Sequence, residues 1–175
     1  AGALDETAAP CTAPLTRTFS VTDTGIVQDV DLSVLASHTY RGDLVTLLES
    51  PTGTRVGLTS SLIGRSGDNF NVTFDDAAST SYVNASNTAT HSTTLPYENI
   101  LSPDSPLSAF NGEVAAGTWT MEICDDFDQD SGTFTRADLT LLTPNTTPST
   151  DLSLTASATV TNPATGSNTV LSFTL

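Results

Sequence analysis

The chain has 175 residues, which is enough for one domain and a short extension. It carries 20 acidic residues against five basic ones, and its net charge is −15 at pH 7. This charge excludes nucleic acid and anionic membrane surfaces as expected partners, because both bind through basic residues. It favours a cation-rich exterior, so we expect a secreted or cell-surface location. No apolar run approaches the roughly 18 residues of a membrane-spanning helix.

The first half of the chain predicts short strands and no helix. Alternation of Val30, Leu32 and Val34 with polar residues indicates a half-buried strand in IVQDVDLSV. Residues 42–58 predict two strands joined by a turn at residues 50–53, because Pro and Gly there favour a reversal of the chain.

Later strands keep the same period of two, and their inward residues are expected to be Phe70, Val72, Phe74, Trp119, Met121 and Ile123. A lone Trp can be a binding platform, but Trp119 lies on an apolar strand and is expected in the core. In GTFTRADLTLL the inward positions change parity between Phe134 and Leu139. This change predicts a β-bulge or kink near residues 136–138.

Residues 76–112 are rich in Ser, Thr, Asn and Pro, and we expect them to form long ordered loops over the sheet. Their isolated apolar anchors are Tyr82, Leu95, Tyr97, Ile100, Leu107 and Phe110. Many short strands without a helix predict an all-β fold, a jelly-roll-like β-sandwich.

The C-terminal part has a different pattern. Residues 143–150 predict a linker, because Pro, Thr and Asn occur there without an apolar anchor. Residues 151–175 predict a β-hairpin or strand extension that is too small to bury its own apolar face. That face is expected to meet the main domain, another molecule or a further domain. The residues that would make this contact are Leu152, Leu154, Val160, Leu171, Phe173 and Leu175.

Several motifs occur in an order that resembles one family. They are SHTYRGDLVTLLESPTGT, FDDAA, LSAFNGEVAAGTWTMEICDD and DSGTFTRADLTLL. Over about residues 17–142 the chain resembles the P domain, or homo B domain, of proprotein convertases and bacterial subtilisin-like proteases. The resemblance implies a β jelly roll beside a catalytic domain, where it supports folding or contacts substrate. Residues 1–16 would be an N-terminal arm, and the tail is similar to the first strands of bacterial immunoglobulin-like surface repeats.

The turn DDFDQDSG concentrates carboxylates at Asp125, Asp126, Asp128 and Asp130. Calcium is the expected cofactor here, because it prefers six to eight oxygen ligands and Asp supplies them with charge. The turn lacks the EF-hand spacing, so remote ligands are needed from strand ends that a jelly roll could gather on one rim. The candidates are Asp43, Asp75 and Asp76. In the alternative, Asp43 caps a turn, Asp75 and Asp76 bond loop amides, and the acidic run is a solvated turn.

The two cysteines, Cys11 and Cys124, lie far apart in the sequence. Their spacing matches no metal-ligand motif. An even pair in a chain that looks secreted predicts a disulfide, and the alternative is two unrelated buried thiols.

No catalytic site is predicted. A serine hydrolase needs a nucleophile, a His base and a carboxylate in one site, and neither His38 nor His91 lies in a protease motif. We expect His38 to be a hydrogen-bonded structural residue at a strand end, and His91 to be solvated in a polar loop. An H-E-x-x-H zinc motif is also absent from the sequence, so we expect no enzyme activity.

Two functions remain. In the first, the chain is complete and is a structural or interaction module that self-associates. Its terminal extension or its N-terminal arm would add a strand to a neighbouring copy. In the second, it is an accessory module of a larger secreted subtilisin-like serine protease. The expected partners are therefore other copies of the same chain or neighbouring domains of a larger protein.

Overall fold

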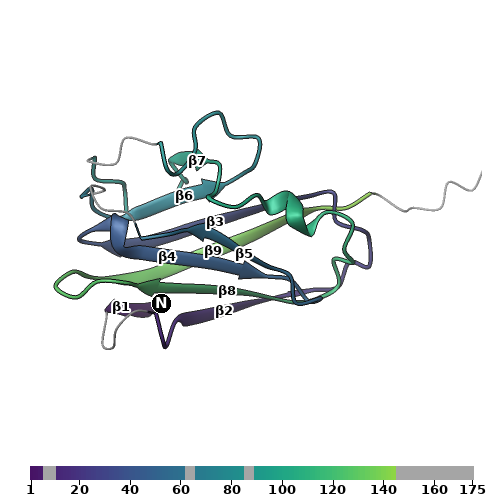
Figure 1. Ribbon diagram of the computed structural model, residues 1–175, viewed down its shortest axis with the longest axis horizontal. Helices are drawn as coiled ribbons and strands as arrows, with labels where there is room; N and C mark the ends of the chain where they lie inside the picture. Colours follow the sequence, from purple (N-terminus) through teal and green to yellow (C-terminus); the bar gives the residue numbers. More distant parts are fainter. Residues whose placement is uncertain (6–10, 62–65, 85–88, 145–175) are drawn as a thin grey trace, which may run out of the picture. The chain divides into compact units, whose positions relative to one another are not determined.

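The computed structural model describes residues 1–5, 11–61, 66–84 and 89–144. Within these ranges two β-sheets pack face to face as a sandwich (Figure 1). One sheet has five strands in the order β1-β9-β3-β6-β7, and the other has four in the order β2-β8-β4-β5. The predicted all-β sandwich is confirmed. No helix in these ranges is long and apolar enough to cross a membrane.

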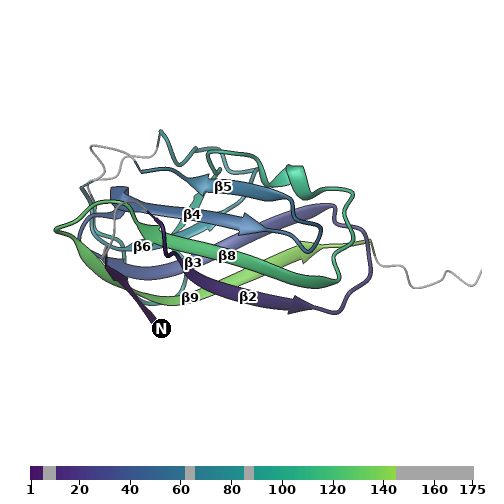
Figure 2. The same ribbon diagram turned by 60° about the horizontal axis from the view of Figure 1, so that its bottom comes forward.

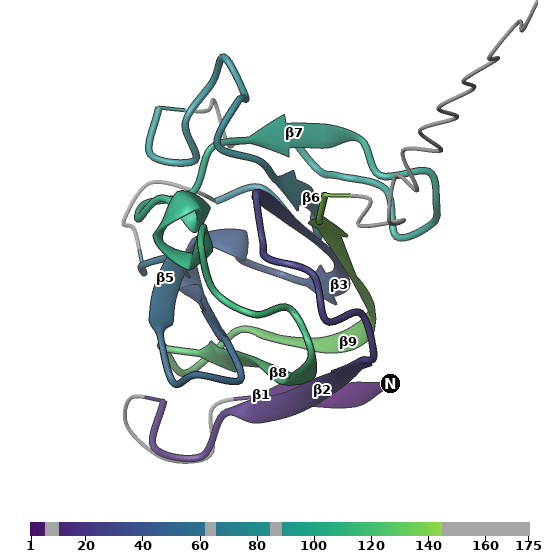
Figure 3. The same cartoon turned by 90° about the vertical axis from the view of Figure 1, so that its right-hand side faces the viewer.

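The five-stranded sheet contains β1 (Gly2–Asp5), β9 (Ser131–Leu142), β3 (Asp29–His38), β6 (Phe70–Phe74) and β7 (Asn99–Leu101). The four-stranded sheet, which faces the viewer in Figure 2, contains β2 (Leu15–Val21), β8 (Gly117–Asp125), β4 (Leu44–Glu49) and β5 (Arg55–Thr59). Two short 3-10 helices are η1 (Arg41–Asp43) and η2 (Leu107–Phe110). Neighbouring strands are antiparallel except β6 and β7, and Figure 3 shows β7 at the opposite side of the sandwich from β1.

The core lies between the two sheets and uses the predicted inward residues. All of them are 0–1% exposed, and they are Val30, Leu32, Val34, Phe70, Val72, Phe74, Trp119, Met121 and Ile123. The indole N–H of Trp119 donates to the Ala115 carbonyl oxygen at 2.9 Å. The Trp119 ring packs edge-on against the Phe110 ring, with the two ring centroids 5.0 Å apart. Trp119 is therefore a core residue, as predicted.

The predicted irregularity in β9 is a β-bulge. Arg136 pairs with Leu35 and Phe134 pairs with Ala36, so Thr135 is the extra residue on β9. The bulge lies one residue before the predicted range, and it lets Phe134 and Leu139 both face the core.

Two further predictions concern the connections. The turn at residues 50–53 is confirmed: the Gly53 N–H donates to the Ser50 carbonyl oxygen at 3.0 Å, and Gly53 has a φ of 90° that favours glycine. The segment 76–112 is not loop throughout, because it contains β7 and η2. The apolar residues expected to anchor this segment differ in burial. Tyr82, Leu107 and Phe110 are fully buried, whereas Leu95 and Ile100 are exposed.

The predicted N-terminal arm contributes a strand to its own domain. Gly2 to Asp5 in β1 pair with Phe134 to Ser131 of β9, and β2 begins at Leu15. Residues 145–175, which include most of the predicted linker and the whole predicted hairpin, lie outside the described residues. The expected contact residues Leu152, Leu154, Val160, Leu171, Phe173 and Leu175 lie there too.

Candidate functional site

One end of the sandwich gathers most of the acidic residues that the sequence singled out. Asp125 ends β8 opposite Leu44, the first residue of β4. This pairing places Asp43 beside the acidic turn, and the Asp126 N–H donates to the Asp43 carbonyl oxygen at 2.9 Å. Asp125 continues the buried alternation of β8, so its side chain is directed inward and the residue is 4% exposed.

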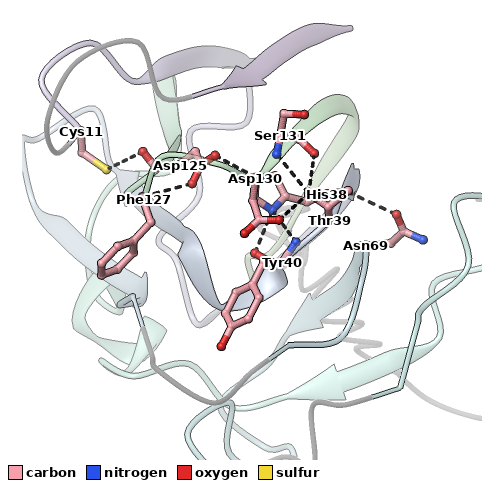
Figure 4. A network of polar contacts seen from close by, with 9 residues as sticks. All are labelled: Cys11, His38, Thr39, Tyr40, Asn69, Asp125, Phe127, Asp130 and Ser131. Carbon is pink, nitrogen blue, oxygen red and sulfur yellow. Dashed lines mark hydrogen bonds and ion pairs between the residues drawn. The ribbon is translucent and has the colours of Figure 1, made fainter.

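The buried Asp125 carboxylate is paired with His38. Nε2 of His38 lies 3.0 Å from Oδ2 of Asp125, and both side chains are fully buried (Figure 4). Nδ1 of His38 lies 2.8 Å from the Tyr40 carbonyl oxygen and 3.2 Å from the Tyr40 N–H. Both ring nitrogens therefore have partners whether the ring is neutral or protonated. This confirms His38 as a structural residue, and its nitrogens are directed to these partners and not to a nucleophile.

Further hydrogen bonds fasten the acidic turn to the end of β3 (Figure 4). Thr39 Oγ1 donates to Asp130 Oδ1 at 2.8 Å, and the Ser131 N–H donates back to Thr39 Oγ1 at 3.1 Å. The Phe127 N–H donates to Asp125 Oδ1 at 3.3 Å. The turn is thus fixed at both of its ends, which gives its side chains defined positions.

Asp43 differs from these acids because its carboxylate makes no hydrogen bond or ion pair within the described ranges, although the residue is only 7% exposed. Burial, followed by the negative charges of Asp125 and Asp130, raises the pKa of Asp43 to about 6. Asp43 lines a pocket of about 250 Å³, which we call the acid-lined pocket. Its lining residues are Tyr40, Asp43, Phe127, Asp128, Gln129 and Asp130.

Asp75 and Asp76 do not join this end, so the expectation of a single rim is wrong for them. Because β6 is antiparallel to β3, Phe74 pairs with Leu32 near the start of β3, far from His38 at its end. Their contacts fit the alternative prediction, in which both carboxylates accept hydrogen bonds from loop amides. Asp76 accepts the N–H groups of Leu107 and Ser108 at 2.8 Å each, and Asp75 Oδ1 accepts the Ala77 N–H at 2.7 Å.

The residues expected to bind calcium therefore fall into two groups, at opposite ends of β3. Asp43, Asp125, Asp126, Asp128 and Asp130 belong to the first group, and Asp75 and Asp76 belong to the second. Across the part of the chain that the structure describes, no three Asp, Glu, His or Cys side chains are placed to hold one metal ion. Calcium stays a prediction of the sequence.

The two cysteines form the expected disulfide. Cys11 and Cys124 are joined with a Cα–Cα distance of 5.5 Å. Cys11 Sγ also lies 4.0 Å from the Asp125 carbonyl oxygen. The disulfide therefore anchors the segment before β2 at the end of β8, beside the buried His38–Asp125 pair.

Arg41 is a structural residue that sequence reasoning missed. It is 0% exposed and donates to the carbonyl oxygens of Asp68, Asn69 and Ala89 at 2.7–2.9 Å. A cation bound by carbonyls holds these loops against η1. Its place between two predicted strands gave no signal of this role, because the carbonyls come from distant segments.

His91 is not solvated, contrary to the sequence expectation. His91 is 9% exposed, and its backbone N–H donates to the Asp68 carbonyl oxygen at 3.0 Å. Burial, followed by the nearby positive charge of Arg41, lowers the pKa of His91 from 6.5 to about 4. The loop packs on a buried cation, and a neutral imidazole is the form that fits there.

The pKa of His91 predicts an acid-dependent loss of stability. As the pH falls from 6.5 towards 4, the unfolded chain binds a proton that folded His91 does not bind. We expect acidification from pH 7 to pH 4.5 to lower the free energy of unfolding by about 1–2 kcal/mol more in wild type than in His91→Gln, after allowance for solvent screening. Urea denaturation at both pH values measures this. Equal losses in the two proteins would contradict the assignment, because all other acids are common to both.

Comparison with known proteins identifies the domain. The model of the proprotein convertase P-domain family matches residues 27–141, which is most of the chain. The chain belongs to this family. P domains are non-catalytic accessory domains of proteases. The P-domain match begins at Val27 in the loop before β3 and ends at Leu141 in β9, so it contains the His38–Asp125 pair and the acid-lined pocket.

Two solved structures share the fold of this P domain. They are the serine protease of Aeromonas sobria in complex with a chaperone, with a TM-score of 0.52, and the same protease alone, with a TM-score of 0.50. Each is 21% identical to this chain, and each alignment covers 81% of this chain and 24% of the protease chain. This P domain thus spans about a quarter of the length of those proteases. No curated protein sequence matches the chain.

Proposed function

We propose that this P domain is a secreted interaction module that self-associates when its terminal extension adds a strand to a neighbouring copy. The observation that carries the proposal is the edge of β9. Within the described ranges β1 pairs only with Ser131 to Phe134, so Arg136 to Leu142 are paired with β3 on one side alone, and the bulged Thr135 pairs with neither strand. Unpaired N–H and C=O groups of such an edge can accept another strand.

The start of this edge is hollowed and is lined by two arginines. A pocket of about 300 Å³ lies there, which we call the edge pocket, and its lining residues are Ala1, Arg17, Thr18, Phe19, Phe134, Thr135, Arg136 and Ala137. The extension at residues 151–175 alternates apolar and polar residues, and its single charged residue is Asp151. A strand of this composition offers apolar side chains to the phenylalanines and a carboxylate to Arg17, whereas Arg136 is already paired with Asp138.

The disulfide and the charge support a secreted location. Cys11 and Cys124 form a disulfide, and such bonds persist in oxidising compartments. A net charge of −15 fits an exterior rich in cations.

The second candidate is an accessory P domain of a larger secreted subtilisin-like serine protease. The 24% coverage of the Aeromonas sobria protease chains favours it, because those P-domain-like regions belong to longer chains. In that setting the edge of β9 would accept a neighbouring segment of the same protease, and the module would stabilise that neighbour or contact its substrate.

Sedimentation equilibrium and hydrogen exchange separate the two candidates. The full chain is compared with a variant carrying Leu152→Ser and Leu154→Ser, and with Ser153→Asn as the matched control. Strand addition predicts oligomers in the full chain and in the control, with slow exchange at Thr135 to Leu142. The double variant is expected to be a monomer with fast exchange there.

The outcomes are distinct. A monomeric full chain with a protected β9 edge would mean that the extension folds back on its own domain. A monomeric full chain with an unprotected edge would contradict strand addition and would leave the accessory module as the better candidate.

A further inference from the structure

The acid-lined pocket lies where η1 meets the turn between β8 and β9, and it combines features that sequence-distant segments supply. Tyr40 and Asp43 form one part of its lining, and residues 127–130 form the other. The hydrogen bonds of Thr39 with Asp130 and Ser131 hold one end of the turn against the end of β3.

We propose that the acid-lined pocket binds the side chain of an arginine that belongs to a partner polypeptide. A planar guanidinium donates to carboxylates in a fork and also stacks on aromatic rings. The pocket offers both kinds of group, with carboxylates at Asp43, Asp128 and Asp130 and rings at Tyr40 and Phe127. This site is separate from the β9 edge, so the inference does not depend on strand addition.

The Asp43 carboxylate is the first argument. The residue is 7% exposed and lines the pocket, yet its carboxylate has no hydrogen-bond or ion-pair partner among the described residues. By contrast, Asp125 is paired with His38, and Asp130 accepts a hydrogen bond from Thr39. A carboxylate of a mostly buried residue that has no protein partner depends on solvent in the pocket, and a cation that enters the pocket supplies a direct partner.

The aromatic side chains are the second argument. Phe127 lies within the acidic turn, is 46% exposed and lines the pocket together with Tyr40. Ring faces attract cations, and the attraction is strongest where water is excluded. An exposed ring beside three carboxylates therefore suits an organic cation.

The charge of the chain is the third argument. Arginines in the described ranges bind backbone carbonyls or acids elsewhere, and none of them lines the pocket. Within those ranges no arginine is placed to fill the pocket, and a chain with a net charge of −15 favours a basic partner. The size agrees with one side chain, because about 250 Å³ is below the range of roughly 300–1,000 Å³ that is typical of small-molecule pockets.

These features favour guanidinium over calcium. Calcium needs six to eight oxygen ligands, whereas no group of three metal-ligating side chains is assembled in the described part of the chain. Two rings in the lining cannot serve as ligands for a hard cation, but they can stack on a guanidinium.

The experiment uses N-acetyl-arginine methylamide as the probe and N-acetyl-citrulline methylamide as its uncharged match. Each is titrated into the full chain, and binding is followed by amide NMR shifts. We expect saturable shifts with the arginine probe at Tyr40 to Asp43 and at residues 126–131, and none with the citrulline probe. Asp43→Asn is expected to weaken binding at least tenfold, and Phe127→Ala several-fold. Asp29→Asn removes the same charge at the other end of β3 and is expected to bind like wild type.

Melting temperatures keep folding separate from binding. Asp43→Asn is expected to melt at a higher temperature than wild type at pH 7, because it removes an unpartnered buried charge, and this gain is expected to disappear near pH 4. Destabilisation by Asp43→Asn at pH 7 would indicate a structural partner and would overturn the proposal. Equal binding of arginine and citrulline, or equal binding by Asp43→Asn and wild type, would also overturn it. Calcium chloride that shifts the same amides and displaces the arginine probe would reassign the pocket to a metal.

Discussion

Removal of the disulfide by Cys11→Ser together with Cys124→Ser is expected to lower the free energy of unfolding by about 3–5 kcal/mol. The bond closes a loop with a sequence separation of 113 residues, so it removes much of the freedom of the unfolded chain. For a loop of about 100 residues the chain-entropy model gives about 4.7 kcal/mol, and structure that persists in the unfolded chain reduces this value.

Urea denaturation of the double variant and of wild type, each with and without reductant, measures this effect. Reductant is expected to bring wild type close to the variant and to leave the variant unchanged. A difference below about 1 kcal/mol would contradict a stabilising role. NMR shifts of Asp125 in the two proteins show whether the disulfide also affects this residue, because Cys11 Sγ lies 4.0 Å from the Asp125 carbonyl oxygen. We expect the His38–Asp125 pair to persist, since its own strands hold it.

Substitution of Gly132 by Ala is expected to lower the free energy of unfolding by about 3 kcal/mol, the upper part of the range for overpacked sites. Gly132 pairs with His38 between β9 and β3. A Cβ at this position would overlap the Ser37 carbonyl oxygen and would lie 2.9 Å from the His38 Cα. Both obstacles belong to the backbone where the end of β3 pairs with the start of β9, so these strands must separate there and His38 must move relative to Asp125.

Gly57→Ala is the matched control, because a Cβ at Gly57 would meet nothing within 4 Å. The control is expected to change the free energy of unfolding by no more than about 0.5 kcal/mol. Thermal and urea unfolding of both variants test the pair. Similar effects of the two substitutions would show that close approach at Gly132 is not the cause.

The strands of the core could be predicted from local patterns. Apolar residues alternate in β3, β6 and β8 because one face of each strand is buried, and this period is visible without any knowledge of the partners. The bulge at Thr135 was also visible, since the parity of inward residues changes within one strand. The strand β7 was missed, because three residues with an exposed Ile100 carry no period at all.

The acidic site was predicted only in part. The sequence placed carboxylates in the turn after β8, and Asp43 was correctly named as a remote neighbour. Asp75 and Asp76 were assigned to the same rim, but strand direction puts them at the other end of β3. His91 was read as solvated because a polar loop usually is, whereas its packing near the buried Arg41 leaves it 9% exposed.

The sequence by itself determined an all-β fold with an acidic turn, and it predicted the P domain and the disulfide, because alternation, turn residues and ordered motifs are visible in the order of residues. The tertiary structure alone decided which acid has a partner and which has none. His38 pairs with Asp125 across the ends of β3 and β8, while Asp43 lines a pocket with Phe127. Whether an acidic side chain is paired depends on which strand ends meet, and whether it is buried depends on what packs over those ends. Neither can be deduced from the order of residues.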